Sequence, residues 1–395
     1  MKRIAIILLP ALCLCWMAYK AARAQTGPSA AQQSTPTAKF ENGGNAAEIA
    51  AAFIDHLVFV PVRVNEGEPS LFELDTSARD SSIDPSRARE LGLSAAKSPV
   101  LNLTGLDVSF SELAETAKPD FAGRLGRPYQ GTLGNDFLGR VVADIDYARE
   151  TVQIYDPDVY KYTRHGKGVH VTFTDGLPVV KAKAVVDGRG IEGDFLVNTA
   201  LDAPVLIFEK YADARRVTLH KPISAASMPI AGAEQATLGR LERFQIGPYT
   251  VQAALVVFSR ERPSVAHDPK LAGEIGAGML RRFGVVFDYS RGQIFLAPNS
   301  EFNSEDFEGM SGLTIVASGP NLKKFEITDV RPLTPGADAG LRKGDVIEGI
   351  NGDAAADLSL AEIRGLFRQL GPPLELVMTR NGRTFKTSLQ MHRLL

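Results

Sequence analysis

Cysteine is almost absent from this sequence. Of its 395 residues only Cys13 and Cys15 are cysteines, and both lie close to the N-terminus. If that segment is removed during export, the remaining chain has neither a thiol nor a disulfide, which excludes a thiol protease. Such a chain depends on its hydrophobic cores alone for stability.

An excess of charge of one sign is also lacking. The formal net charge is −2, and lysine and arginine are scattered along the chain. The sequence therefore does not predict binding to nucleic acid or to an anionic membrane surface. The six histidines lack the H-E-x-x-H spacing of zinc peptidases, so we expect no metal.

Two further motifs are missing. The stretch from Gly309 to Gly312 is one residue short of the G-x-S-x-G pattern that presents a nucleophilic serine. The glycines between Gly273 and Gly278 have neither a phosphate-binding lysine nor dinucleotide spacing. The sequence therefore predicts neither a serine hydrolase of that type nor a bound cofactor.

The N-terminus has the organisation of a secretory signal. Lys2 and Arg3 precede an apolar run over residues 4–17, and Ala-Arg-Ala follows at residues 22–24. The run is shorter than the roughly 20 residues of a membrane span. We therefore predict a signal peptide over residues 1–24 and an exported protein, periplasmic or secreted, with an uncleaved N-terminal anchor as the alternative. Residues 25–46, rich in small and polar residues, are predicted to form a flexible linker.

One fifteen-residue sequence pattern occurs twice. Residues 62–76 read VRVNEGEPSLFELDT and residues 185–199 read VVDGRGIEGDFLVNT, and the two align without a gap. Each copy is an apolar strand, a glycine-containing turn and a returning strand. The alignment sets Asp75 in the first copy opposite Asn198 in the second.

The repeat continues beyond these patterns. Residues 133–138 (LGNDFL) and 275–280 (IGAGML) correspond, and each is followed by a second matching segment, Asp-Tyr-Ala-Arg at 146–149 or Asp-Tyr-Ser-Arg at 288–291. Two anchors in the same order predict a duplicated unit. We expect a mostly β protein with one lobe at residues 47–160 and the other at 161–304.

A third region is predicted at residues 305–395. Ser359 and Glu362 have the spacing of a capping box that opens a helix, and Asn381-Gly382 is typical of a tight hairpin turn. The mixture of strands and a helix indicates a separate α+β domain.

The paired motifs resemble those of aspartic peptidases of the retropepsin and pepsin type, in which an Asp-Thr-Gly loop is answered by a later apolar strand that ends in glycine. The matching residues are, in the first lobe, Asp75, Thr76, Ser77 and Gly134 and, in the second, Asn198, Thr199, Ala200 and Gly276. The chain is most similar to bacterial exported proteins with two tandem retropepsin-like β-barrel lobes and a C-terminal PDZ domain. The PDZ resemblance lies in Ala339-Gly340-Leu341 and in residues 344–347.

This resemblance implies peptide-bond hydrolysis by a water held between two carboxyls that share a proton. Asp75 would be one of them, and Asn198 is a degenerate partner that can hold water but cannot shuttle a proton. General acid–base assistance is typically worth about 10²–10⁴-fold in rate. Thr76 and Thr199 would bond across the two lobes. Glycine-tipped flaps are expected near Thr104-Gly105 and residues 231–233.

Three interpretations stay open. Asp75 works as an impaired peptidase on a peptide or protein substrate; two chains pair their first lobes in a homodimer with an Asp75/Asp75 site; or the protein binds peptides, or acts as a scaffold, without cutting. The resemblance also implies that backbone N–H groups of Gly312, Leu313 and Thr314 capture the C-terminal carboxylate of a peptide ligand.

Overall fold

The computed structural model describes residues 37–93, 98–116, 122–219, 236–260, 270–306 and 310–394. Strands dominate it and its helices are short, which confirms the prediction of a mostly β protein. None of the helices in these ranges has the length and apolar character needed to cross a membrane. The predicted signal peptide and the second predicted flap, at residues 231–233, lie outside the described residues.

The first lobe is built on a nine-stranded sheet with the order β1-β8-β7-β4-β5-β10-β6-β9, and β3 pairs with β4 beside this path. Parallel pairing of β5 with β10 brings two segments distant in sequence side by side. The bounds are β1 Thr37–Phe40, β3 Ala52–Ile54, β4 Leu57–Val64, β5 Ser70–Leu74, β6 Ser82–Ile83, β7 Val100–Leu103, β8 Leu106–Ser109, β9 Ala114–Glu115, β10 Gly131–Leu133, η1 Glu41–Gly43, α2 Pro85–Glu90, α3 Ala122–Leu125 and α4 Asn135–Leu138.

The second lobe repeats this plan in another nine-stranded sheet, with the order β18-β21-β17-β22-β16-β15-β19-β20 and β14 paired with β15. Here β16 and β22 are the parallel neighbours. The bounds are β14 Thr172–Thr174, β15 Leu177–Val186, β16 Arg189–Asn198, β17 Val205–Phe208, β18 Ala236–Arg240, β19 Arg243–Ile246, β20 Tyr249–Gln252, β21 Leu255–Ser259, β22 Leu271–Gly276, α5 Glu209–Asp213 and α6 Ala277–Leu280.

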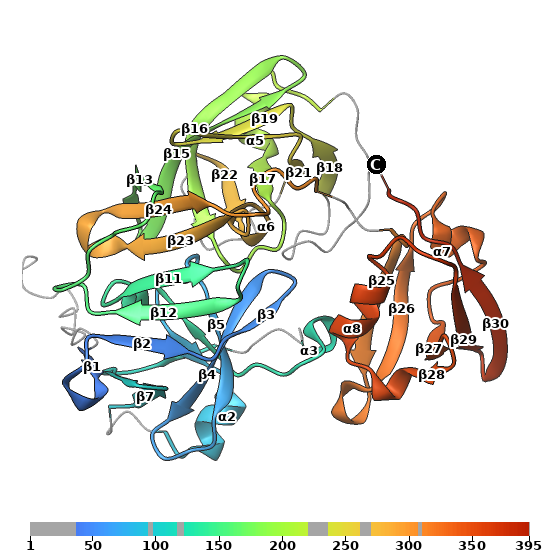
Figure 1. Ribbon diagram of the computed structural model, residues 1–395, viewed down its shortest axis with the longest axis horizontal. Helices are drawn as coiled ribbons and strands as arrows, with labels where there is room; N and C mark the ends of the chain where they lie inside the picture. Colours follow the sequence, from blue (N-terminus) through green and yellow to red (C-terminus); the bar gives the residue numbers. More distant parts are fainter. Residues whose placement is uncertain are drawn as a thin grey trace, which may run out of the picture. The chain divides into compact units, whose positions relative to one another are not determined.

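A six-stranded sheet joins the two lobes, in the order β13-β24-β23-β11-β12-β2. At its centre β11 from the first lobe pairs antiparallel with β23 from the second, and the two lie side by side in Figure 1. One continuous hydrophobic cluster contains buried side chains from both lobes. The bounds are β2 Ala46–Ile49, β11 Val142–Asp146, β12 Thr151–Tyr155, β13 Lys167–His170, β23 Phe283–Asp288, η2 Tyr289–Arg291 and β24 Gln293–Pro298.

The predicted linker over residues 25–46 is wrong in its last part. From Thr37 the chain already forms β1, which pairs with β8, and β2 begins at Ala46 and pairs with β12. Alternate residues of β2 are buried, including Ala47 and Ile49. The small and polar composition of this segment hid a strand whose burial depends on partners distant in sequence.

Local sequence signals explain several turns and caps. Asp187 and Gly188 both have positive φ, 46° and 73°, as a two-residue hairpin between β15 and β16 requires. Asp84 accepts a hydrogen bond from the Ser86 backbone at 2.8 Å, and Pro85 occupies the first position of α2, where its missing N–H costs nothing.

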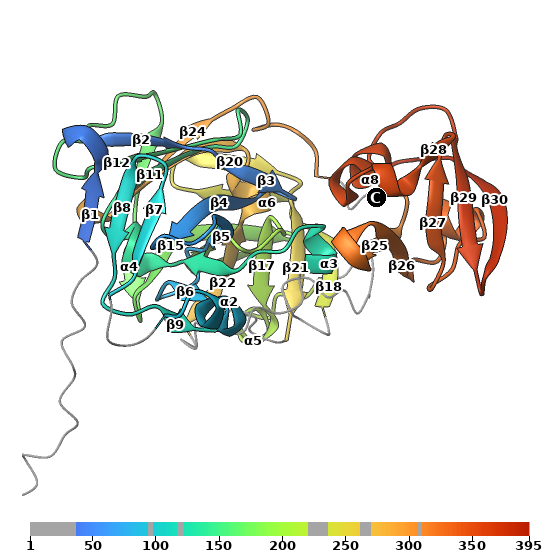
Figure 2. The same cartoon turned by 90° about the horizontal axis from the view of Figure 1, so that it is seen from below.

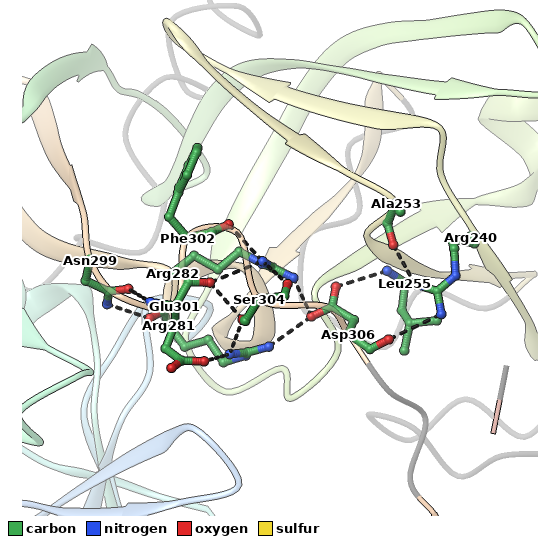
Figure 3. A network of polar contacts seen from close by, with 10 residues as sticks. All are labelled: Arg240, Ala253, Leu255, Arg281, Arg282, Asn299, Glu301, Phe302, Ser304 and Asp306. Atoms are coloured by element: carbon green, nitrogen blue, oxygen red, sulfur yellow. Dashed lines mark hydrogen bonds and ion pairs between the residues drawn. The ribbon is translucent and has the colours of Figure 1, made fainter. Parts of the chain in front are cut away.

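A buried ion-pair network holds the segment that leaves the second lobe (Figure 3). The Arg282 side chain is 1% exposed, and its guanidinium donates to Asp306 Oδ1 at 2.6 Å and to the backbone carbonyls of Phe302 and Ser304. Arg281 binds the same Asp306 oxygen at 3.0 Å, and Leu255 N donates to the other oxygen at 3.1 Å. Because several donors surround one buried carboxylate, removing it would leave buried charge unpaired.

The C-terminal domain has its own hydrophobic core and its own sheet, ordered β25-β26-β27-β29-β30 with β28 beside β27. Strand β25 is at the edge, and α8 lies beside it (Figure 1, Figure 2). Ser359 and Glu362 form the predicted capping box. The bounds are β25 Leu313–Ser318, η3 Pro320–Leu322, β26 Lys324–Val330, α7 Pro335–Asp338, β27 Val346–Ile350, β28 Asp353–Ala354, η4 Ala355–Asp357, α8 Leu360–Leu366, β29 Leu374–Arg380 and β30 Arg383–Leu389.

Candidate active site

Asp75 and Asn198 occupy equivalent positions at the ends of the repeated strands. Asp75 follows the last residue of β5, and its backbone N–H donates to Leu133 O of β10 at 3.0 Å. Asn198 is the last residue of β16 and is in register with Gly276 of β22. Each residue is therefore held between a parallel strand pair and the turn that follows it. Asp75 is half-buried, whereas Asn198 is 6% exposed.

The two threonines that follow these residues exchange hydrogen bonds between the lobes. Thr76 N donates to Thr199 Oγ1 at 3.0 Å, and Thr199 N donates to Thr76 Oγ1 at 3.0 Å. Each hydroxyl also donates to a carbonyl of the opposite lobe at 2.6 Å, Thr76 to Val197 and Thr199 to Leu74. Both threonines are 1% exposed. The structure thus brings the Asp75 loop and the Asn198 loop together.

Two glycines allow these loops to cross their neighbouring strands closely. A Cβ at Gly134 would lie 2.9 Å from Ala78 O, and a Cβ at Gly276 would lie 2.0 Å from Ala203 O. Real Cβ atoms do not approach a backbone oxygen so closely, so both positions require glycine for space rather than for backbone conformation. Gly134 and Gly276 therefore allow the close packing behind the Asp75 and Asn198 loops.

Each loop holds its central side chain in the same way. Ser77 donates to Asp75 Oδ1 through its backbone N–H at 2.7 Å and through its hydroxyl at 2.6 Å. In the second loop Ala200 N donates to Asn198 Oδ1 at 2.9 Å, and alanine has no hydroxyl to add. The Oδ1 atoms of Asp75 and Asn198 are therefore the equivalent acceptors of the two loops.

A buried glutamate next to Asn198 was missed by the sequence analysis. Asn198 Nδ2 donates to Glu274 Oε2 at 2.6 Å, and Glu274 is 0% exposed. Glu274 lies in β22, where all six residues are buried. A glutamate inside the run Leu271–Gly276 was the signal that could have found it, because a fully buried carboxyl needs a specific partner.

Two phenols are electrostatically coupled to Asp75. Burial raises the pKa of Tyr129, and the negative charges of Glu73 and Asp75 raise it further. Burial also raises the pKa of Tyr289, with a further contribution from Asp75. Both phenols therefore keep their protons at ordinary pH.

The first predicted flap is tied into the sheet of its own lobe. Gly105 forms the turn between β7 and β8, with φ of 82°, and its carbonyl accepts from Glu41 N at 3.0 Å. Because β8 also pairs with β1, this hairpin is held along its outer edge.

In the C-terminal domain, the predicted carboxylate-binding loop lies at the start of β25. Gly312 has a φ of 71°, and a Cβ there would meet the Thr334 side chain, so glycine is needed on both grounds. Leu313 N donates to Ser311 Oγ at 3.2 Å. Arg364 of α8 donates to Ile315 O at 3.1 Å, so one carbonyl of β25 is already engaged within the domain. Thr314 follows in the same strand.

No group of three or more histidine, cysteine, aspartate or glutamate side chains suited to a metal ion occurs among the described residues.

Comparison with known proteins identifies one domain. The PDZ domain family matches residues 326–380, so the C-terminal region of this chain contains a PDZ domain. No curated protein matches the chain.

Two solved structures are similar over short stretches. The photosystem II D1 C-terminal processing protease is 28% identical over 21% of this chain, with a TM-score of 0.20, and only 23% of that protein's length is covered. The PDZ domain of HtrA3 bound to a phage-derived ligand is 19% identical over 22% of this chain and 88% of that one, with a TM-score of 0.20.

Proposed function

We propose that the two lobes are retropepsin-like and form a peptidase site of the aspartic type, in which Asp75 activates a water for attack on a peptide bond. The reciprocal threonine hydrogen bonds are the observation that carries this proposal. These bonds join two duplicated loops. In each loop the side-chain Oδ1 of Asp75 or Asn198 accepts a hydrogen bond from a backbone N–H of the same turn. Two acceptors presented in this way suit a water that donates one hydrogen to each.

Asp75 is the general base of the proposed reaction. Its ionised carboxylate takes one proton from the water as the water oxygen attacks the scissile carbonyl, and Asn198 Oδ1 accepts a hydrogen bond from the other hydrogen. The Asp75 carboxyl then returns its proton to the leaving nitrogen as the C–N bond breaks. Asn198 has no acidic proton to give, so the assistance of a second carboxyl is lost. We expect rates reduced by about 10²–10⁴-fold relative to a site with two carboxyls.

Hydrolysis of fluorogenic peptides by wild type and Asp75→Asn tests this function. We expect slow cleavage by wild type that falls about a hundredfold or more in Asp75→Asn. Asp80→Asn is the matched control, because Asp80 belongs to the same loop but its side chain is exposed. Cleavage by Asp75→Asn at the wild-type rate would reject the proposal. Activity per chain that rises with protein concentration would instead support an Asp75/Asp75 site in a homodimer.

Peptide binding without cleavage is the second candidate function. The hydrogen bond between Asn198 and Glu274 favours it, because this bond holds an amide in the position that a second catalytic carboxyl would occupy. A wild type that binds peptides, fails to hydrolyse them and is unaffected in binding by Asp75→Asn would support this alternative.

We also propose that the PDZ domain selects peptide or protein substrates by their C-terminus. The family match supports it, as does the position of Gly312, Leu313 and Thr314 at the start of β25, the edge strand of its sheet. Helix α3 contacts β25, and a Cβ at Gly123 would lie 2.7 Å from Ala317 O, so a peptide that pairs along the whole strand must displace α3. A ligand carboxylate would compete with Ser311 Oγ for the N–H of Leu313. Peptides with a free C-terminus should therefore bind more tightly than their amidated forms, and equal affinity would contradict this mode.

We propose an exported protein on the basis of the residues at positions 1–24. N-terminal sequencing of protein recovered from the exporting cell should begin at Gln25. A chain that keeps Met1 would favour the N-terminal anchor instead.

A further inference from the structure

The Asn198 carboxamide has one defined orientation. Ala200 N can only donate, so the atom it contacts at 2.9 Å is the amide oxygen. The other end of the amide donates to Glu274 Oε2 at 2.6 Å. Glu274 thus engages Nδ2 and leaves Oδ1 in the position that matches Asp75 Oδ1.

The two lobes differ at a second position that is coupled to the first. In the repeat, Thr132-Leu133-Gly134 corresponds to Glu274-Ile275-Gly276, so Thr132 is the first-lobe counterpart of Glu274. Thr132 lies in β10, which is parallel to β5, and Glu274 lies in β22, which is parallel to β16. The aspartate of the first lobe therefore occurs with a threonine, and the asparagine of the second lobe occurs with a glutamate.

Electrostatics gives this pairing a physical reason. A carboxyl at position 198 in place of the amide would lie at hydrogen-bond distance from a second carboxyl that is 0% exposed. Two buried carboxylates at that separation cannot both ionise, so the pair must share a proton. A carboxamide avoids this, because its N–H group is a donor to the carboxylate.

We propose that Glu274 is a positioning residue of the Asp75 site, which orients the Asn198 amide and makes position 198 unsuitable for a second aspartate. The catalytic meaning of this inference rests on the proposed function. Its consequence is that Asn198→Asp alone does not rebuild an aspartic dyad, because the new carboxyl shares its proton with Glu274 instead of with Asp75.

The test compares wild type, Asn198→Asp, Glu274→Gln and the double variant, with Asn351→Asp as a control. Asn351 has an exposed side chain whose oxygen accepts from Glu375 N, so a carboxylate fits there and reports only the general effect of one added charge. Peptide hydrolysis and the folded-to-unfolded ratio are measured between pH 5 and pH 8. If the double variant does not fold, Glu274→Thr, the first-lobe residue, replaces Glu274→Gln.

Stability is the readout that does not depend on catalysis. The shared proton raises the folded-state pKa of the new carboxyl pair above its unfolded value, so the pair's contribution to stability is lost as pH rises. Relative to wild type, the folded-to-unfolded ratio of Asn198→Asp should fall about tenfold or more from pH 5 to pH 8. The fall should be smaller in the double variant and absent from Asn351→Asp.

Hydrolysis supplies the catalytic readout. The double variant should cleave peptides about tenfold or more faster than Asn198→Asp. The inference is overturned if Asn198→Asp has the pH profile of stability of wild type, or if Glu274→Gln changes neither readout in the Asn198→Asp background. Stability coupling without hydrolysis by any variant would reject the proposed function and leave the positioning role intact. Hydrolysis that is lost in Asp75→Asn but does not depend on the residue at position 274 would support the proposed function and reject the positioning role of Glu274.

Discussion

Thr76 and Thr199 hydrogen-bond to each other's loops in a reciprocal pattern. Each backbone N–H donates to the other threonine's Oγ1 at 3.0 Å, and each hydroxyl donates at 2.6 Å to a carbonyl of the opposite lobe. Each hydroxyl therefore satisfies a buried donor and a buried acceptor of the other lobe. This exchange fixes the loops of Asp75 and Asn198 against one another.

Replacing either threonine with valine keeps the shape and removes the hydroxyl. Thr76→Val leaves Thr199 N and Val197 O without these partners, and we expect a loss of about 2–3 kcal/mol in the free energy of unfolding, measured by urea denaturation. Thr76→Ser keeps the hydroxyl and should lose less than about 1 kcal/mol. The double valine variant should lose less than the sum of the two single losses, because both act on one network. Wild-type stability in Thr76→Val would contradict the role assigned to the exchange.

Gly276 should not tolerate even one added methyl group. In Gly276→Ala the Cβ would lie 2.0 Å from Ala203 O and 2.6 Å from Leu201 O, both backbone atoms of the loop behind the site. We expect a loss of about 3 kcal/mol or more in thermal or urea unfolding. Gly365→Ala is the control, since its Cβ would enter open space in α8 and should stabilise the chain by about 0.5–1 kcal/mol. Equal stability of the two variants would show that the loop is not packed as described.

Asp306 should be the most sensitive residue of the network shown in Figure 3. Asp306→Asn removes the carboxylate that pairs with the buried Arg282 and with its neighbour Arg281, and we expect a loss of about 2–4 kcal/mol in the free energy of unfolding. Glu301→Gln removes a carboxylate that is 48% exposed and pairs with Arg281, so the loss should stay under about 1 kcal/mol. If Glu301→Gln lowers the free energy of unfolding more than Asp306→Asn does, burial is not the reason that this network stabilises the fold.

Asp345 should make the stability of the PDZ domain depend on pH in the acidic range. Burial opposes its ionisation, but hydrogen bonds from Arg380 and from the Arg342 backbone outweigh burial and lower the pKa of the Asp345 carboxyl. Its contribution to stability is therefore present above the unfolded pKa of about 3.9 and is lost as the pH falls below that value. Urea unfolding should show Asp345→Asn less stable than wild type by about 2–3 kcal/mol at pH 7, with a smaller difference at pH 3. A difference that grows on acidification would mean that the sign is wrong.

The sequence predicted the parts of the site that repeat. Asp75, Asn198 and the two threonines were placed opposite one another because the duplication sets matching strand ends together, and the structure has the two threonines in direct contact. The start of the helix after the Ser359 cap was also predicted, and this helix ends at Leu366. The capping signal is local and fixes a helix start, whereas the end depends on packing against β25.

The parts that were missed depend on contacts distant in sequence. Glu274 contacts Asn198 across 76 residues, and only the parallel pairing of β16 with β22 reveals it. The strand at residues 37–40 was predicted to be part of the linker, because its partner strand β8, at residues 106–109, is distant in sequence. Arg282 and Asp306 each look like ordinary surface charges in the sequence, and only the fold shows that both are buried.

Cross-linking between positions 75 and 198 tests the central claim most directly. A chain that begins at Gln25 contains no cysteine, so Asp75→Cys and Asn198→Cys would be its only thiols. A short thiol-specific cross-linker should join them within one chain, giving a monomer with both thiols blocked and the two peptides linked after digestion. The control pairs Asn198→Cys with Asp107→Cys in β8, three strands from β5 in the same sheet, and should not cross-link. Cross-links only between chains, or none at positions 75 and 198, would contradict the facing of the two loops.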